Sequence, residues 1–178
     1  METAVDADAR RTEAISLYQA GNLSQAMSEF EQARAEFVAR GNESKAASVA
    51  NDLGVVYFRA GKKQQALQVL QQALASFEKL GDVIGQAKAT GNLAQLMSQS
   101  GDKEGAEKNY THAAELFHQA GERSMEHDTY RALSQMHLQH GRWLEALGAY
   151  DRALAASGSS RLLRLFLQIP LRLTGLRR

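Results

Sequence analysis

The sequence predicts an all-α protein: a right-handed α-solenoid of four antiparallel helix pairs, followed by an amphipathic C-terminal segment. Three observations support this class. A glycine stands at every twentieth position over most of the chain, apolar residues recur every 40 positions, and the segments between glycines have the apolar spacing of helices. The composition agrees, because Ala, Leu, Gln, Glu and Arg are good helix formers and the 178 residues include one proline.

The glycines divide the chain into segments of about 20 residues. They stand at Gly21, Gly41, Gly61, Gly81, Gly101, Gly121 and Gly141. Because glycine enters the left-handed conformation without a Cβ penalty, we expect each of them to end a helix. Asn22, Asn42, Asp82 and Asp102 come next and favour the start of a new helix. Seven glycines therefore separate eight helices.

The apolar residues of successive pairs coincide when the chain is shifted by 40 positions. The coinciding sets are Ala26, Ala66, Ala106 and Ala146; Ala33, Ala73, Ala113 and Ala153; Leu53, Leu93 and Leu133; and Phe37, Phe77 and Phe117. Within a segment they follow the i, i+3, i+4, i+7 spacing of one helix face. We expect these columns to form the core, with the alanines allowing close approach of the helices.

The 40-residue period divides the chain into three regions. We expect a flexible N-terminus at residues 1–8, and four repeats at about 9–41, 42–81, 82–121 and 122–157. Residues 158–178 form a basic amphipathic C-terminal segment in this interpretation.

The repeat pattern resembles a known family. The second repeat reads Leu53-Gly54, Tyr57, Ala66, Leu70 and Ala73, and the third reads Leu93-Ala94, Met97, Ala106, Tyr110 and Ala113. These positions resemble tetratricopeptide (TPR) repeats over about residues 9–157. The usual TPR period is 34 residues, so this chain is similar to the long-helix variety of kinesin light chains, spindle-orientation adaptors and bacterial peptide-sensing regulators. The resemblance implies a protein-binding scaffold or adaptor, with a peptide-sensing regulatory module as the alternative.

The resemblance also implies where a partner binds. In TPR arrays the first helices of the pairs line a concave groove. The matching positions here are Arg11, Tyr18, Asn51, Val55, Phe58, Lys88, Gln95, Arg131 and Gln135. The competing interpretation is that these are ordinary exposed helix residues. Chaperone-binding TPR arrays grip a terminal carboxylate, but Asp52 stands where that grip needs an asparagine, so we expect a different ligand.

Signals for catalysis are weak. The chain has no cysteine, which excludes disulfides and thiolate nucleophiles, and it has no GxxxxGK[ST], HExxH or GxSxG motif. His137 and His140 are spaced as two metal ligands on one helix face, but no third ligand is evident and His137 lies in the packing column of Tyr57 and Met97. We therefore expect no enzyme activity, no metal and no cofactor.

Charge separates the C-terminal segment from the rest. Five of the 21 basic residues and none of the 20 acidic ones lie in residues 161–178, so residues 1–160 carry a net charge of −4. An acidic body disfavours nucleic acid as a partner. The N-terminus has no secretory signal, so we expect a cytoplasmic location, with a peripheral position at a membrane as a further option.

The C-terminal segment, RLLRLFLQIPLRLTGLRR, has a narrow polar stripe and a wide apolar face. Its candidate contact residues are Arg161, Arg164, Leu165, Phe166 and Arg172. Three interpretations remain open: a helix that caps the array or self-associates, a segment that lies on an anionic membrane, and a segment that docks on a partner.

Overall fold

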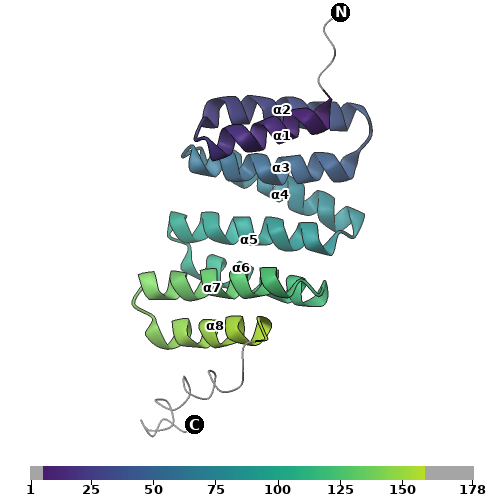
Figure 1. Ribbon diagram of the computed structural model, residues 1–178. Coiled ribbons are helices and arrows are strands. Elements are labelled where there is room, and N and C mark those ends of the chain that lie inside the picture. The colour runs from purple at the N-terminus through teal and green to yellow at the C-terminus, as the bar shows by residue number, and fades with distance from the viewer. Residues whose placement is uncertain (1–5, 159–178) are drawn as a thin grey trace, which may run out of the picture.

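The structure is a computed structural model that describes residues 6–158 (Figure 1). These residues form eight helices: α1 (Ala7–Gln19), α2 (Leu23–Ala39), α3 (Glu43–Arg59), α4 (Lys63–Leu80), α5 (Val83–Ser100), α6 (Lys103–Gln119), α7 (Arg123–Gln139) and α8 (Trp143–Ala156). The predicted fold class, a right-handed α-solenoid of four antiparallel helix pairs, is confirmed. The predicted amphipathic segment at the C-terminal end lies outside the described residues, apart from Gly158.

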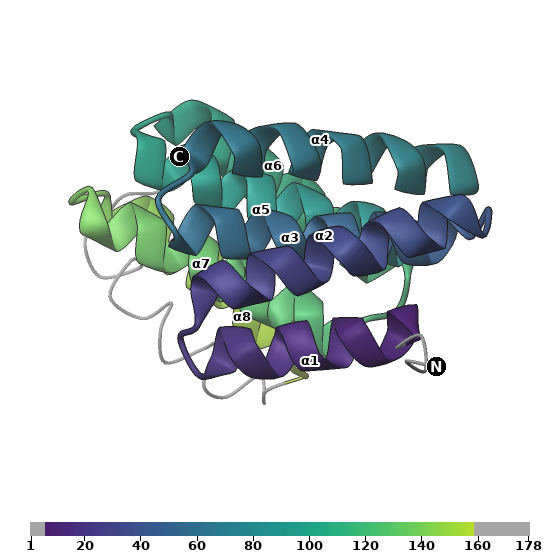
Figure 2. The same ribbon diagram turned by 90° about the horizontal axis from the view of Figure 1, so that it is seen from above.

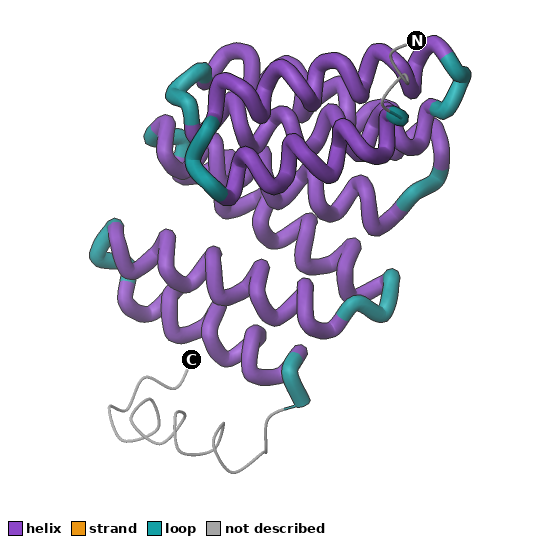
Figure 3. Tube along the Cα trace, turned by 45° about the horizontal axis from the view of Figure 1, so that its top comes forward, coloured by secondary structure: helices purple, strands orange, loops and turns teal. Residues whose placement is uncertain are grey.

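The helices stack one pair on the next, and each helix packs against the one before it and the one after it. The turns lie alternately on two opposite sides of the stack, as Figure 3 shows in teal. The stack is not straight. Seen from above in Figure 2, α4 and α6 lie on one side of the molecule, and α1 and α8 lie on the other.

The first helix begins earlier than the sequence-based boundary at residue 9. Ala7 and Asp8, expected in a flexible N-terminus, lie in the first turn of α1. Ala7 is fully buried, and the Lys45 Nζ of α3 lies 2.6 Å from a carboxylate oxygen of Asp8. Burial and this ion pair hold the first turn against the second repeat.

All seven turns between helices have the same hydrogen bonding, and the predicted role of the glycines is confirmed. Each turn glycine has a positive φ, from 68° at Gly81 to 90° at Gly101. The next residue donates its N–H to a carbonyl five positions earlier, as in the bond from Asp82 to Phe77 (2.9 Å). This is the Schellman arrangement, which satisfies carbonyls that a helix end leaves unpaired.

All four predicted helix starts are confirmed, because Asn22, Asn42, Asp82 and Asp102 are the N-cap residues of α2, α3, α5 and α6. The side chains of Asn42, Asp82 and Asp102 accept hydrogen bonds from backbone N–H groups three residues later. Asn22 stands at the same position before α2, but its side chain makes no such bond.

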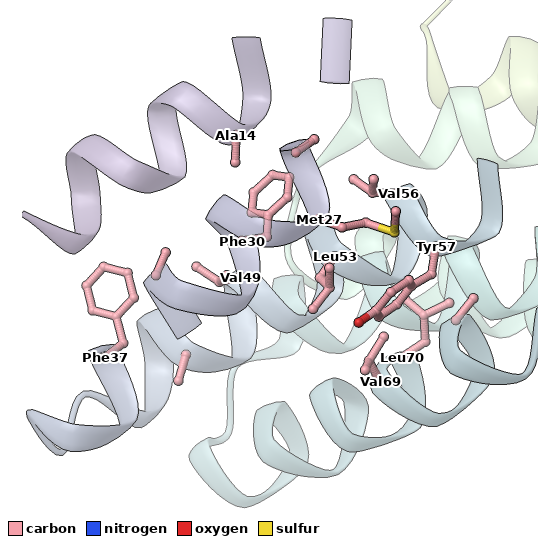
Figure 4. Packing of buried hydrophobic residues seen from close by; sticks show 14 of the residues in the cluster. Ala14, Met27, Phe30, Phe37, Val49, Leu53, Val56, Tyr57, Val69 and Leu70 are labelled. Atoms are coloured by element: carbon pink, nitrogen blue, oxygen red, sulfur yellow. The ribbon is translucent and has the colours of Figure 1, made fainter. Parts of the chain in front are cut away.

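The four predicted core columns are buried (Figure 4). The exposed fraction of the alanines in the two alanine columns is 2% or less, and that of Leu53, Leu93 and Leu133 is 4% or less. In Figure 4, Phe30 lies between Ala14 and Val49, and Leu53 lies close to Met27. Residues that are 40 positions apart thus occupy equivalent places in the interior.

Helix α5 joins the interior along the length of the stack. Among the described residues, the buried apolar side chains form four clusters, and each of them contains a residue of α5. Leu93 belongs to the cluster that begins at α1, whereas Ala94 belongs to the cluster that reaches α8. The four pairs therefore share connected packing.

None of the helices in residues 6–158 is long and apolar enough to cross a bilayer.

Substituting Ala66 with leucine should destabilise the fold. Ala66 is fully buried where α4 packs on its neighbours. Added methylenes in a packed core cost about 1–3 kcal/mol, so we expect a lower thermal midpoint. Gln68→Leu, at an exposed position of the same helix, is the matched control and should leave the midpoint nearly unchanged. An equal midpoint for both variants would contradict the packing register.

Two glycine-to-alanine substitutions should have opposite effects. A Cβ on Gly54 would lie 2.6 Å from Leu70 Cδ2, whereas a Cβ on Gly148 would have no heavy atom within 4 Å. Alanine favours a helix interior over glycine by about 1 kcal/mol, so Gly148→Ala should stabilise by roughly that amount. For Gly54→Ala the clash should outweigh the gain and leave a net loss of about 1–2 kcal/mol. Urea unfolding measures both, and a stabilised Gly54→Ala variant would show that the contact relaxes.

A polar hollow between α3, α5, α6 and α7

Helices α3, α5, α6 and α7 line a hollow of about 370 Å³. Three of the predicted groove residues line it: Asn51 of α3, and Lys88 and Gln95 of α5. The remaining lining residues are Ala87, Gly91 and Asn92 of α5, Tyr110 and Phe117 of α6, and Met125, Asp128, Thr129 and Ala132 of α7. The lining thus combines amides and charges with aromatic and small apolar side chains.

The lining residues are related by a regular spacing that the 40-residue repeat does not show. Asn51 and Asn92, which are hydrogen-bonded, lie 41 residues apart. The lining pairs Lys88 and Thr129, and Gly91 and Ala132, have the same separation of 41. Residues that meet between neighbouring first helices are therefore 41 positions apart, one more than the repeat period of 40. This offset brings the lining residues together.

The Asn51–Asn92 pair is the polar centre of the hollow. Asn92 Nδ2 donates to Asn51 Oδ1 at 2.9 Å, and the exposed fraction of Asn51 is 8%. This bond uses one donor and one acceptor of the two amides. The NH₂ group of Asn51 and the carbonyl oxygen of Asn92 make no hydrogen bond to a described residue. The pair therefore offers one donor group and one acceptor group side by side.

Charges of both signs flank the amides. Lys88 is exposed and makes no ion pair with another described residue. Asp128 is also exposed, and its Oδ1 lies 3.1 Å from His127 Nδ1 and 3.7 Å from Arg131 Nη1. A ligand that spans the hollow can thus meet a cation on α5 and an anion on α7.

The other predicted groove residues do not line this hollow. Arg11 donates from Nη2 to Asp52 Oδ2 at 2.7 Å, which ties α1 to α3. Tyr18 and Phe58 are half-buried against the first core cluster, and the Arg59 guanidinium lies over the Tyr18 ring at 5.3 Å. Val55 is half-buried, and Arg131 and Gln135 are exposed on α7. Arg11 in particular is engaged by Asp52 and is not an unpaired cation.

Several lining residues were missed from sequence. Asn92 is not among the predicted groove residues, and Tyr110 was identified only as a position of the repeat pattern. Burial raises the pKa of Tyr110 to about 12. The 41-residue spacing is the signal that identifies Asn92 and Thr129, because Asn92 lies 41 positions after Asn51 and Thr129 lies 41 positions after Lys88.

His137 belongs to the core, not to a ligand set. Its exposed fraction is 3%, and its Nδ1 has no hydrogen-bond partner among the described atoms. Its Nε2 lies 3.9 Å from Glu107 Oε1, and Glu107 Oε2 accepts a hydrogen bond from Arg142 at 2.8 Å. No three His, Cys, Asp or Glu side chains within residues 6–158 are grouped as metal ligands.

The fold and the repeat columns define a TPR-type helical-repeat protein, and comparison with known families agrees. The family described as "Tetratricopeptide repeat" matches residues 6–79. The family described as "Soluble NSF attachment protein, SNAP" matches residues 56–169, which is more than half of the chain. The chain therefore belongs to the SNAP family, within the TPR-type repeat proteins. No curated protein matches the sequence significantly.

Solved structures share the fold at low sequence identity. The chain is similar to BtubC (BKLC) from P. vanneervenii, with 20% identity and a TM-score of 0.74 over 86% of this chain and 63% of that one. A Rap protein complexed with competence and sporulation factor gives 19% identity and a TM-score of 0.79, covering 86% of this chain and 43% of that one. Aspartyl phosphate phosphatase F from Bacillus subtilis gives 15% identity and a TM-score of 0.79, covering 91% of this chain and 44% of that one. The chain thus spans less than two thirds of each structure.

Lowering the pH should destabilise the protein through His137. Burial lowers the pKa of His137 below its ordinary value of 6.5, against the opposing effect of Glu107, while Arg142 lowers it further. The unfolded chain then takes up this proton at a higher pH than the folded chain does. The contribution of neutral His137 is therefore fully present above about pH 6.5 and is lost as the pH falls through the folded-state pKa.

The variant His137→Met isolates this effect, because Met97 occupies the equivalent column in the previous repeat. Chemical unfolding at about pH 7.5 and about pH 5.5 should show a larger loss of stability in the wild type than in His137→Met. Equal losses would mean that His137 titrates alike in both states.

Proposed function

We propose that this protein is an interaction scaffold or adaptor that binds a segment of a partner polypeptide in the hollow between α3, α5 and α7. The observation that carries the proposal is the Asn51–Asn92 pair, which lines the hollow and has one amide donor group and one acceptor group left over. A peptide backbone presents the complementary groups, one N–H and one C=O per residue. Two such bonds would orient a peptide without regard to its sequence.

Selectivity would come from the surroundings of the amide pair. Gly91, Ala87 and Ala132 leave room for a side chain, and Tyr110 and Phe117 give the hollow an apolar wall. Lys88 and Asp128 favour a segment that carries an acidic group on one side and a basic group on the other. We therefore infer a segment with a small apolar anchor between charges of opposite sign.

The similar structures support a peptide or protein partner. One of them is a Rap protein complexed with competence and sporulation factor. The same likeness favours a second candidate, in which the present chain is a peptide-sensing regulatory module. The two candidate functions predict different effects of ligand binding: a sensor changes shape when its ligand binds, whereas a scaffold does not.

Selection from a displayed peptide library tests the proposal. Peptides that bind the intact chain should bind the Asn51→Ala and Lys88→Glu variants at least tenfold more weakly. Gly91→Leu should also block binding by filling the hollow, since a Cβ at this position approaches other atoms no closer than 3.8 Å, at Ala113 Cβ. Isothermal titration measures the affinities.

Two controls accompany these variants. Lys108→Glu reverses a charge on the exposed face of α6 outside the hollow, and Gln68→Ala removes an exposed amide of α4. Both should bind the selected peptides as the wild type does. Peptides that bind all five variants equally would place the binding surface elsewhere, and small-angle scattering with bound peptide separates the sensor from the scaffold.

A further inference from the structure

A groove lies between α2 and α4, with side chains of α3 on its floor. It consists of two adjoining cavities of about 500 Å³ and about 340 Å³, and Arg34 and Val38 of α2 line both of them. None of the residues that line this α2–α4 groove also lines the polar hollow. The groove is therefore a separate surface of the molecule.

The floor of the α2–α4 groove is apolar. Leu53 of α3 and Val69 of α4 line the larger cavity, and Ala47 and Ala50 of α3 line the smaller one. These four side chains are buried, whereas Val38 has an exposed fraction of 61%. A ligand in the groove would thus meet apolar surface along most of its length.

The 40-residue repeat does not reproduce this floor in the next pair. Gln86 and Thr90 stand 40 positions after Ala46 and Ala50, which both line the smaller cavity. Larger side chains therefore occupy the equivalent places on α5. The open floor is a property of the second repeat and does not follow from the repeat pattern.

Arg34 is a cation without an acidic partner at the place where the two cavities adjoin. Its Nη2 donates to Gln72 Oε1 of α4 at 2.9 Å, and it makes no ion pair with another described residue. The equivalent positions in the other repeats are apolar, namely Leu74, Ala114 and Leu154. Because Arg34 is half-buried, a ligand carboxylate beside it would form a charge-assisted hydrogen bond that is partly shielded from water.

The walls of the groove favour a helical ligand over an extended one. Backbone N–H and C=O groups inside α2, α3 and α4 are paired within those helices, and the Gln72 side chain is engaged by Arg34. An extended segment would leave many of its own backbone groups unpaired, whereas a helix pairs them internally. The α3 positions that line the groove run from 46 to 57, about 16 Å or three helical turns.

We propose that the α2–α4 groove binds an amphipathic helix of a partner protein, whose apolar face carries one acidic residue that pairs with Arg34. Apolar side chains on the two sides of this residue would pack in the two cavities. The proposal does not depend on the function of the polar hollow. Charge argues against residues 161–178 of the same chain as the occupant, because they include five arginines and no acidic residue.

Selection from a displayed library of helical peptides tests the proposal. The peptides have about 15 residues, an apolar stripe of Ala, Leu and Val, and one fully randomised position in the middle of the stripe. Full-length chain is the target. We expect Asp and Glu to be enriched at the randomised position among peptides that bind.

Exchange of the two charges then locates the contact. A selected peptide with a central Glu should bind Arg34→Glu at least tenfold more weakly than wild type, and the same peptide with a central Lys should regain affinity for Arg34→Glu. Ala35→Phe, at an exposed position that lines the larger cavity, should also block binding. Fluorescence anisotropy measures the affinities.

Two control variants should bind the selected peptides as the wild type does. Arg123→Glu reverses an exposed arginine of α7 outside the groove, and Asn51→Ala alters the polar hollow alone. Thermal melting followed by circular dichroism verifies that Arg34→Glu and Ala35→Phe are folded.

Four results would overturn the proposal. The first is a selection without enrichment of acidic residues at the central position. The second is equal affinity of the peptides for wild type and Arg34→Glu. The third is loss of binding in Asn51→Ala, which would place the peptides in the hollow. The fourth is a wild-type chain that sediments as a dimer while Ala35→Phe sediments as a monomer, which would make a second copy the occupant.

Discussion

The fold depends on one hydrogen bond, repeated seven times. After each turn glycine, the next backbone N–H bonds to the carbonyl five positions earlier, as Asp102 does to Met97 at 3.0 Å. The bond is possible only because the glycine between them takes a left-handed conformation. This bond fixes the position at which the chain reverses direction. The next helix then packs antiparallel to the previous one, with the alanine and leucine columns in register.

The repeat made most of this architecture predictable. The eight helices, the turn glycines, the buried columns and the four helix starts all follow from short-range rules applied every 20 or 40 residues. Asn22 also precedes a helix, although its side chain makes no capping hydrogen bond. The first turn of α1 contacts the second repeat through buried Ala7 and the ion pair of Asp8 with Lys45, and no local rule includes such contacts.

The hollow was predictable only in part, because its residues meet across repeats. Asn51, Lys88 and Gln95 were identified by resemblance, and each lines the hollow. Arg11 was chosen by the same reasoning, yet it pairs with Asp52, which lies 41 residues further on. The 41-residue offset reflects how one pair is rotated on the next, and this rotation is a property of the packed stack that a 40-residue alignment does not contain.

The place of α5 in all four apolar clusters bears on how the array comes apart. Repeat arrays whose units touch only their neighbours can lose end units one at a time. Here the loss of α5 would uncover apolar side chains on α3, α4, α6 and α7 at once, since each shares a cluster with it. The middle of the molecule should therefore resist fraying, and melting of the third repeat should take the whole array into the unfolded state in one cooperative step.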